Sequence, residues 1–270
     1  MTKNNLSRYP LSSLPTNGVP YPEDWSIEIT PYAFGQSTGV RESDITQRRF
    51  YNCMLDGVYT NFDKSLLVLE DILFIGSARK LVSSKSSKVI LKSVCPECLN
   101  ENAITLDLKD VVRFSESKIT REKYPVKVTF SKYIGWFSYL TLNESLELMK
   151  SKQSKGTETA ANLAKRTVKL VELVGDENIE KVVYDKKQGG IFDFESLKTL
   201  YDSFRDEDSE TLEQLLELFE DIKLLPIKVK CSDEKCGTEY EQDLSIGGLS
   251  QYLSPFRDIS KRENTNNIDV

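Results

Sequence analysis

Two cysteine pairs constrain the fold of this chain more than any other feature of its sequence. Cys95 and Cys98 are separated by two residues, and Cys231 and Cys236 by four. Each pair occupies a turn between two strand-like stretches, namely residues 88–92 and 103–108 for the first pair and 226–230 and 238–244 for the second. A strand, a cysteine turn and a second strand are typical of a zinc knuckle, in which the backbone amides of the turn also support the thiolates.

The two pairs together supply what one zinc ion needs, because Zn²⁺ in structural sites is bound by four soft ligands in a tetrahedron. We therefore predict one shared structural Zn²⁺ site formed by Cys95, Cys98, Cys231 and Cys236. Such a site would close a loop of more than a hundred residues. The entropic cost of closure grows only logarithmically with loop length, so the binding energy of structural zinc can offset it.

The sequence also allows other interpretations of the cysteine pairs: two unrelated hairpin turns, a site that has lost its metal, or redox pairs. A thioredoxin-like pair would need a strand-to-helix context, whereas both pairs here lie between strands. A disulfide framework would need an oxidising compartment, and residues 1–8 lack the apolar region of a signal peptide. Cys53 lies in an apolar stretch, where we expect it to be a small buried hydrophobe.

The complete absence of histidine limits the chemistry open to this chain. It removes Ser-His-Asp and Cys-His catalysis, histidine-ligated zinc hydrolases and the commonest general base near neutral pH. Neither GxGxxG nor GxxxxGK(S/T), the glycine-rich motifs that bind nucleotide phosphates, is present. We therefore expect no enzyme, no catalytic or cofactor-binding residues and no small-molecule substrate.

Composition and charge describe an ordinary globular protein of 270 residues, with 39% hydrophobic and 29% charged residues. The net charge of −6 argues against a general nucleic-acid binder, which would need a basic surface to displace counterions. No apolar run approaches twenty residues, so we expect no membrane span. The protein is expected to work in a reducing cytoplasm or in something assembled there.

Apolar periodicity predicts two helices before the first cysteine pair, over residues 42–60 and 68–82, and two strands after it, over 126–130 and 134–137. Thr141 and Glu144 form a capping box, so a helix is expected to start there. From that point to residue 223 the chain is expected to be helical, with helices over residues 159–174, 192–204 and 209–222.

These elements predict an α+β fold in which an α-helical insertion splits a β-hairpin zinc-knuckle module. The module comprises residues 1–138 and 224–256, the helical insertion residues 139–223, and a flexible tail residues 257–270. Residues 1–13 are polar and are expected to be ordered only when a partner holds them. The two termini and the helical block are the best candidates for partner contacts.

Several short phrases of the first half occur in a distinctive order. They are Leu14-Pro15, Gly18, Tyr21-Pro22-Glu23, Pro31-Tyr32-Ala33-Phe34-Gly35, Phe74-Ile75-Gly76, Arg79-Lys80 and the turn Cys95-Pro96-Glu97-Cys98. In these phrases, over roughly residues 14–150, the chain resembles the T4-type bacteriophage baseplate proteins, specifically the hub subunit and hub-assembly family. Leu99 departs from the pattern, because such a knuckle often has glycine there.

The resemblance implies a virion structural or assembly protein at the hub of a contractile tail baseplate. Its partners would be other baseplate hub or tail proteins, and its location the virion tail baseplate or, during viral tail assembly, the host cytoplasm. The metal-binding knuckles would then stabilise a scaffold rather than support catalysis.

Two other functions remain possible from the sequence. A zinc-ribbon nucleic-acid-binding or transcription-associated module would use local positive charge at Arg79-Lys80 and residues 85–88, although Asp233-Glu234 and the overall acidity oppose it. A redox protein would use Cys95 and Cys98.

Overall fold

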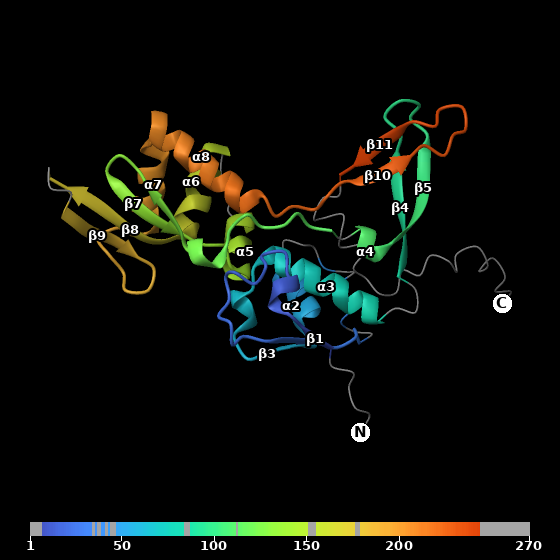
Figure 1. Ribbon diagram of the computed structural model, residues 1–270, viewed down its shortest axis with the longest axis horizontal. Helices are drawn as coiled ribbons and strands as arrows, with labels where there is room; N and C mark the ends of the chain where they lie inside the picture. The colour runs from blue at the N-terminus through green and yellow to red at the C-terminus, as the bar shows by residue number, and fades with distance from the viewer. Residues whose placement is uncertain are drawn as a thin grey trace, which may run out of the picture.

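The computed structural model describes residues 7–33, 36, 39–40, 43, 47–83, 87–111, 113–150, 155–175 and 179–243. Helices and four small antiparallel sheets confirm the α+β class. Figure 1 shows three groups of elements: an N-terminal group at the bottom, a pair of hairpins at the upper right, and a sheet with helices at the left. The predicted tail, 257–270, lies outside the described residues.

The N-terminal group is a three-stranded sheet covered by helices. Its elements are β1 (Ser7–Tyr9), η1 (Leu11–Ser13), β2 (Ile27–Ile29), α2 (Arg48–Leu55), β3 (Val58–Thr60), η2 (Lys64–Leu66) and α3 (Leu69–Ser83), with strand order β1-β2-β3. The expectation that residues 1–13 need a partner to be ordered is wrong for residues 7–13, because β1 pairs with β2. The predicted helix over 42–60 is also too long: α2 ends at Leu55, and β3 pairs with β2.

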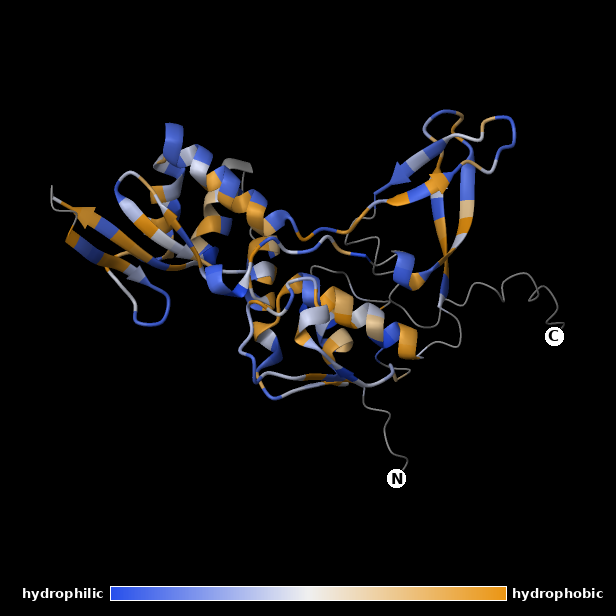
Figure 2. Ribbon diagram, in the orientation of Figure 1, coloured by the Kyte–Doolittle hydropathy of each residue, from blue (hydrophilic) through white to orange (hydrophobic). Residues whose placement is uncertain are grey.

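Helix α3 is the centre of the N-terminal group, and much of its length is hydrophobic (Figure 2). The helix predicted over residues 68–82 is therefore confirmed within a residue at each end. Buried side chains occur on almost every side of α3, including Ile72, Leu73, Ile75 and the two charged residues Asp71 and Arg79. A helix that is buried all round must satisfy its polar side chains internally.

Asp71 binds the segment that leads into β2. Its carboxylate accepts hydrogen bonds from the Thr16 amide (3.1 Å), the Thr16 hydroxyl (2.7 Å) and the Tyr21 hydroxyl (2.5 Å). The Tyr21 hydroxyl in turn accepts from the Val68 amide at 2.9 Å. Burial raises the pKa of Asp71 to about 7, although the hydrogen bonds from Tyr21 and Thr16 act in the opposite direction. This network fixes residues 16–21 on the N-terminal end of α3.

Arg79 performs the same role at the other end of α3. Its guanidinium donates to the carbonyl oxygens of Thr30 (2.8 Å), Met54 (2.6 Å) and Pro31 (3.3 Å), and lies 4.0 Å from the centre of the Tyr32 ring. The chain turns beside it at Gly57, whose φ is 102°. A Cβ atom at Gly57 would lie 2.5 Å from Arg79 Nη2, so glycine is required by both conformation and space.

The two cysteine hairpins are β4 (Lys88–Val94) with β5 (Glu101–Asp107), and β10 (Ile227–Lys230) with β11 (Glu239–Gln242). Helix α4 (Leu108–Val111) follows β5. Two segments connect the hairpins to the third group, and they run side by side. The Ser115 amide donates to the Lys223 carbonyl at 2.9 Å, and the Leu225 amide to the Arg113 carbonyl at 2.8 Å. All the elements of the third group lie between these two segments in the sequence.

The third group is a four-stranded antiparallel sheet with four helices. After η3 (Arg121–Lys123), it comprises β6 (Val126–Thr129), β7 (Tyr133–Phe137), α5 (Leu142–Lys150), α6 (Lys155–Arg166), β8 (Thr167–Val174), β9 (Ile179–Asp185), α7 (Phe194–Ser203) and α8 (Asp206–Glu220). The strand order is β6-β7-β8-β9. The predicted capping box begins α5: the Thr141 amide donates to Glu144 Oε2 at 2.9 Å, and the Glu144 amide lies 3.5 Å from Thr141 Oγ1.

The prediction of a purely helical segment over 139–223 is wrong. The helix expected over 159–174 ends at Arg166, and its second half is β8. Residues 167–174 contain Val168, Val171 and Val174, whose branched side chains favour a strand when a neighbouring strand is available to pair with them. Strands β8 and β9 complete the sheet begun by β6 and β7, so this sheet joins residues from both sides of position 139. The other domain boundaries stay predictions.

The Asp71 network generates a stability prediction. Asp71→Ala leaves the amide and hydroxyl of Thr16 and the hydroxyl of Tyr21 without their acceptor inside the core. We expect the free energy of unfolding to fall by roughly 2–4 kcal/mol, measured by urea denaturation at pH 7. Glu217→Ala, an exposed acidic position on α8, is the control and should change it by less than about 0.5 kcal/mol. Equal effects of the two substitutions would contradict this account of α3.

Candidate metal centre

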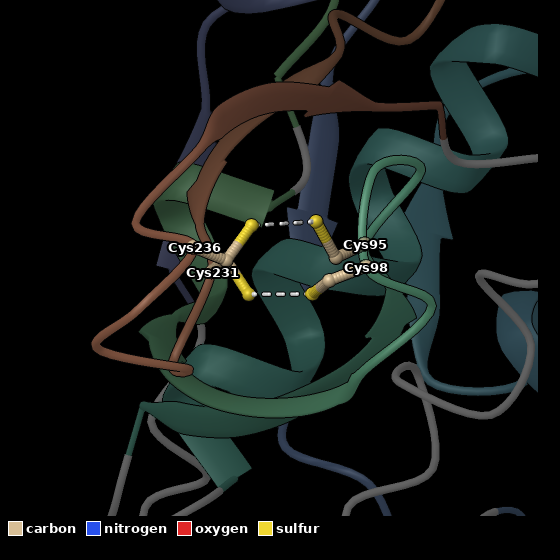
Figure 3. Close-up of side chains that lie close together, drawn as sticks. All are labelled: Cys95, Cys98, Cys231 and Cys236. Atoms are coloured by element: carbon tan, nitrogen blue, oxygen red, sulfur yellow. Dashed lines mark hydrogen bonds between the residues drawn. The ribbon is translucent and has the colours of Figure 1, made fainter.

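The structure brings the two cysteine pairs together, face to face. Cys95 and Cys98 lie in the turn between β4 and β5, and Cys231 and Cys236 in the turn between β10 and β11. Their four Sγ atoms all lie within 4.8 Å of one another. Figure 3 shows each sulfur of one hairpin opposite a sulfur of the other: Cys95 and Cys236 are 3.8 Å apart, and Cys98 and Cys231 are 3.5 Å apart.

These distances fit a tetrahedral thiolate site. Sulfur ligands about 2.3 Å from a zinc ion stand about 3.8 Å from one another at the corners of a tetrahedron. A disulfide would instead need the sulfur atoms about 2.05 Å apart, and all five cysteines are free thiols. The cluster can therefore accept a tetrahedral ion with only small movements of the side chains. The role of the four cysteines as metal ligands stays a prediction.

The two turns share the same backbone plan. In the first, the Leu99 amide donates to the Cys95 carbonyl at 3.0 Å; in the second, the Gly237 amide donates to the Asp233 carbonyl at 2.9 Å. The residue after the second cysteine is left-handed in both, with φ of 60° at Leu99 and 58° at Gly237. The hairpins are thus two copies of one local design, as the sequence predicts.

Hydrogen bonds in each turn act on the thiol groups. The hydrogen bond between Cys236 Sγ and the Thr238 hydroxyl, 3.2 Å long, and a second one from the Thr238 backbone lower the pKa of Cys236 to about 7. The Asn100 backbone also lowers the pKa of Cys98, but removal of water and the three neighbouring thiols outweigh it and raise that pKa to about 12. Four neighbouring thiols cannot all lose their protons unless a cation lies between them, because the negative charges of the thiolates repel one another.

A buried amide also joins the two hairpins. The Asn102 side chain accepts hydrogen bonds from the amide and the hydroxyl of Ser232, both at 2.7 Å, and donates to the Tyr240 hydroxyl at 2.9 Å. The same Tyr240 hydroxyl lies 2.7 Å from Ser93 Oγ. Sequence reasoning did not identify Asn102. The sequence feature that points to Asn102 is its position on the inward face of a strand, because a buried asparagine in a strand needs hydrogen-bond partners for its side-chain amide.

The remaining candidate residues lie elsewhere. Cys53 is half-buried on α2 and packs against the core, outside the cysteine cluster. The Arg79 and Lys80 side chains, which the nucleic-acid hypothesis needed on the surface, are both buried. Among the described residues, no second group of three or more metal-ligating side chains comes together. No helix in this part of the chain combines the length and the apolar character needed to cross a membrane.

The fold and the cysteine cluster define an α+β protein with a candidate four-thiolate metal centre. The family model described as "T4 bacteriophage base plate protein" matches residues 43–254 of the chain. The chain therefore belongs to the T4 bacteriophage base plate protein family. No curated protein and no solved structure matches it.

Membership of this family confirms the resemblance at the level of a T4-type baseplate protein. The chain is a phage baseplate structural protein, located in the virion tail baseplate. Its partners are other phage tail proteins. The match begins after the phrases Leu14-Pro15 and Tyr21-Pro22-Glu23, so the likeness at the start of the chain is a separate observation.

The Asn102 contacts generate a second prediction. Asn102→Ala removes the acceptor of the Ser232 amide and hydroxyl, so the unfolding free energy should fall by about 2–3 kcal/mol. Hydrogen exchange of the Ser232 amide should become faster, because the β10–β11 hairpin is released from β5. Thr105→Ala, an exposed position on the same strand, should change neither quantity. Unchanged exchange at Ser232 in the Asn102 variant would show that this contact does not hold the hairpins together.

Proposed function

We propose that this protein is a non-enzymatic structural or assembly protein of the hub region of a contractile phage tail baseplate, and that its four clustered cysteines hold one structural zinc ion. The observation that carries the proposal is the meeting of two cysteine pairs, 133 residues apart from Cys98 to Cys231, in a member of the baseplate family. All four sulfur atoms lie within 4.8 Å of one another, and the Cys95–Cys236 and Cys98–Cys231 distances of 3.8 and 3.5 Å are close to the about 3.8 Å expected between thiolates around one zinc ion, which supports a shared site over chance contact of two hairpins.

Zinc is the metal that the donor set favours. Four thiolates are soft ligands and suit a tetrahedral ion without redox chemistry. With Cys95, Cys98, Cys231 and Cys236 all bound, no coordination position remains for water or substrate, so the ion would cross-link the chain rather than catalyse a reaction. The backbones of Asn100 and Thr238 hydrogen-bond with Cys98 and Cys236, which supports the charged form of both sulfurs.

A structural ion is useful in this part of the molecule because the hairpins are small. Each is a separate two-stranded sheet, and a two-stranded hairpin is marginally stable by itself in water. The zinc ion and the Asn102 contacts would join them into one rigid unit. A rigid projecting unit is suited to holding neighbours in a particle.

The hub assignment rests on the resemblance at the start of the chain. Leu14-Pro15, Gly18 and Tyr21-Pro22-Glu23 resemble the opening of the hub family. Their conformation is consistent with a fixed structural role: Tyr21 binds Asp71, and the Arg121 guanidinium donates to the carbonyls of Gly18 and Tyr21, both at 2.8 Å. Residues 14–23 are therefore held in place by the rest of the fold, as expected of a segment that is specific to one family.

Metal analysis tests the zinc component. The purified wild-type chain should contain about one zinc ion per molecule, and Cys95→Ser and Cys236→Ser should lose most of it because three thiolates bind zinc much more weakly than four. Cys53→Ser is the matched control and should keep its zinc. In the wild type, the four clustered thiols should react with a thiol reagent only after a chelator or mild acid removes the metal, since protons compete for the thiolates. Equal zinc content in wild type and Cys95→Ser would end the zinc hypothesis.

Affinity purification from infected cells tests the hub component. A tagged chain should co-purify with baseplate hub or tail proteins, and its binding to nonspecific DNA at low salt should be negligible because of the net charge of −6. Recovery with nucleic acid and steep salt dependence, without tail proteins, would favour the zinc-ribbon nucleic-acid module instead. Recovery with proteins of the outer baseplate alone would contradict the hub assignment while leaving the zinc site intact.

A further inference from the structure

The two cysteine turns differ at one equivalent position in a way that the fold does not explain. The residue after the second cysteine is left-handed in both turns, where glycine is the favoured residue. The second turn has Gly237 there, but the first has Leu99. A leucine at φ of 60° strains the backbone, so this turn is less favourable than its partner.

Leu99 also contributes nothing to the core. Its side chain is 74% exposed, more than any other large hydrophobic residue among those described. The chain therefore keeps a strained backbone conformation in order to present an apolar side chain to solvent. Backbone strain at a residue that does not pack against the core indicates that the residue has a functional role.

The surroundings of Leu99 define the chemistry of a complementary surface. Val94, at the same end of the β4–β5 hairpin, is 52% exposed. The two turns carry three acidic side chains, Glu97, Asp233 and Glu234, against the single lysine Lys235. Leu99 and Val94 are therefore exposed apolar residues beside two turns with a net negative charge, which we call the acidic rim. These turns lie at the outer end of the hairpins, away from the other two groups (Figure 1).

The turn is also held in one conformation. The Cys95 amide donates to the Asn100 carbonyl at 3.0 Å, and the Asn100 side chain donates to Ser232 Oγ of the other hairpin at 3.1 Å. A side chain presented from a fixed turn loses little conformational entropy when it binds. This is the property expected of an anchor residue in a protein–protein interface.

We propose that Leu99 is a docking anchor, which inserts into an apolar pocket with a basic rim on a neighbouring baseplate protein. The acidic rim favours a basic protein surface and repels the phosphates of nucleic acid, so the occupant is a protein. The identity of this neighbour as a baseplate protein rests on the proposed function. The existence of the docking site rests on the conformation, exposure and charge of the turn.

Leu99→Gly separates docking from folding. Glycine removes the strain, so the apparent melting temperature and the bound zinc should stay the same or rise. Recovery of baseplate proteins with the variant chain should fall by about tenfold or more, because the buried leucine side chain is lost from the interface. Leu99→Met should retain most of the recovery. Ile191→Gly, which removes another exposed apolar side chain (66% exposed), is the matched control and should retain it fully.

A photo-crosslinking amino acid at position 99 identifies the surface directly, with position 191 as the control. Cross-links from position 99 should concentrate on one peptide that combines apolar residues with lysine or arginine. Full recovery of partners by Leu99→Gly would overturn the docking inference. Cross-links that are spread over many sites, that reach an acidic protein surface or that reach DNA would overturn it as well. A discrete apolar and basic target outside the baseplate would support docking and overturn the proposed location of the partner instead.

Discussion

The meeting of four sulfur atoms is the constraint on which the cysteine hairpins depend. Neither hairpin has a core of its own, and the residues that join them lie more than 130 positions apart in the chain. The intervening chain does not behave as an open loop, because its two ends run side by side at residues 113–115 and 223–225. The folded third group thus shortens the effective loop that the sulfur cluster must close, which lowers the entropic cost of bringing the cysteines together.

The N-terminal group is held together in part by the two buried charged side chains of α3. Asp71 and Arg79 do not pair with each other; each binds backbone or hydroxyl groups of segments that have little regular structure. Irregular backbone inside a protein needs partners for its polar groups, and these two side chains supply them. Besides the shared hydrophobic core, the three groups therefore use different contacts: buried charges on α3, thiols and the Asn102 amide between the hairpins, and sheet-and-helix packing in the third group.

Much of this design was predictable from local sequence. The cysteine spacing identified both hairpins, and the Thr141–Glu144 capping box identified the start of α5. Periodicity failed at β8 because the apolar positions of residues 167–174 fit a helix as well as a strand, and only pairing with β7 decides between them. Asp71 could not be identified in advance, because its hydrogen-bond partners are distant in sequence and a buried acid looks the same as an exposed one. For Asn102 the sequence offers only its position on the inward face of a strand, and not the residues that it binds.

X-ray absorption at the zinc edge of the purified protein determines whether the four sulfur atoms bind a common ion. We expect one zinc ion per chain bound by four sulfur atoms, with zinc–sulfur distances of about 2.3 Å. A spectrum with fewer sulfur ligands, with nitrogen or oxygen in the first coordination sphere, or with no zinc in a folded protein would contradict it.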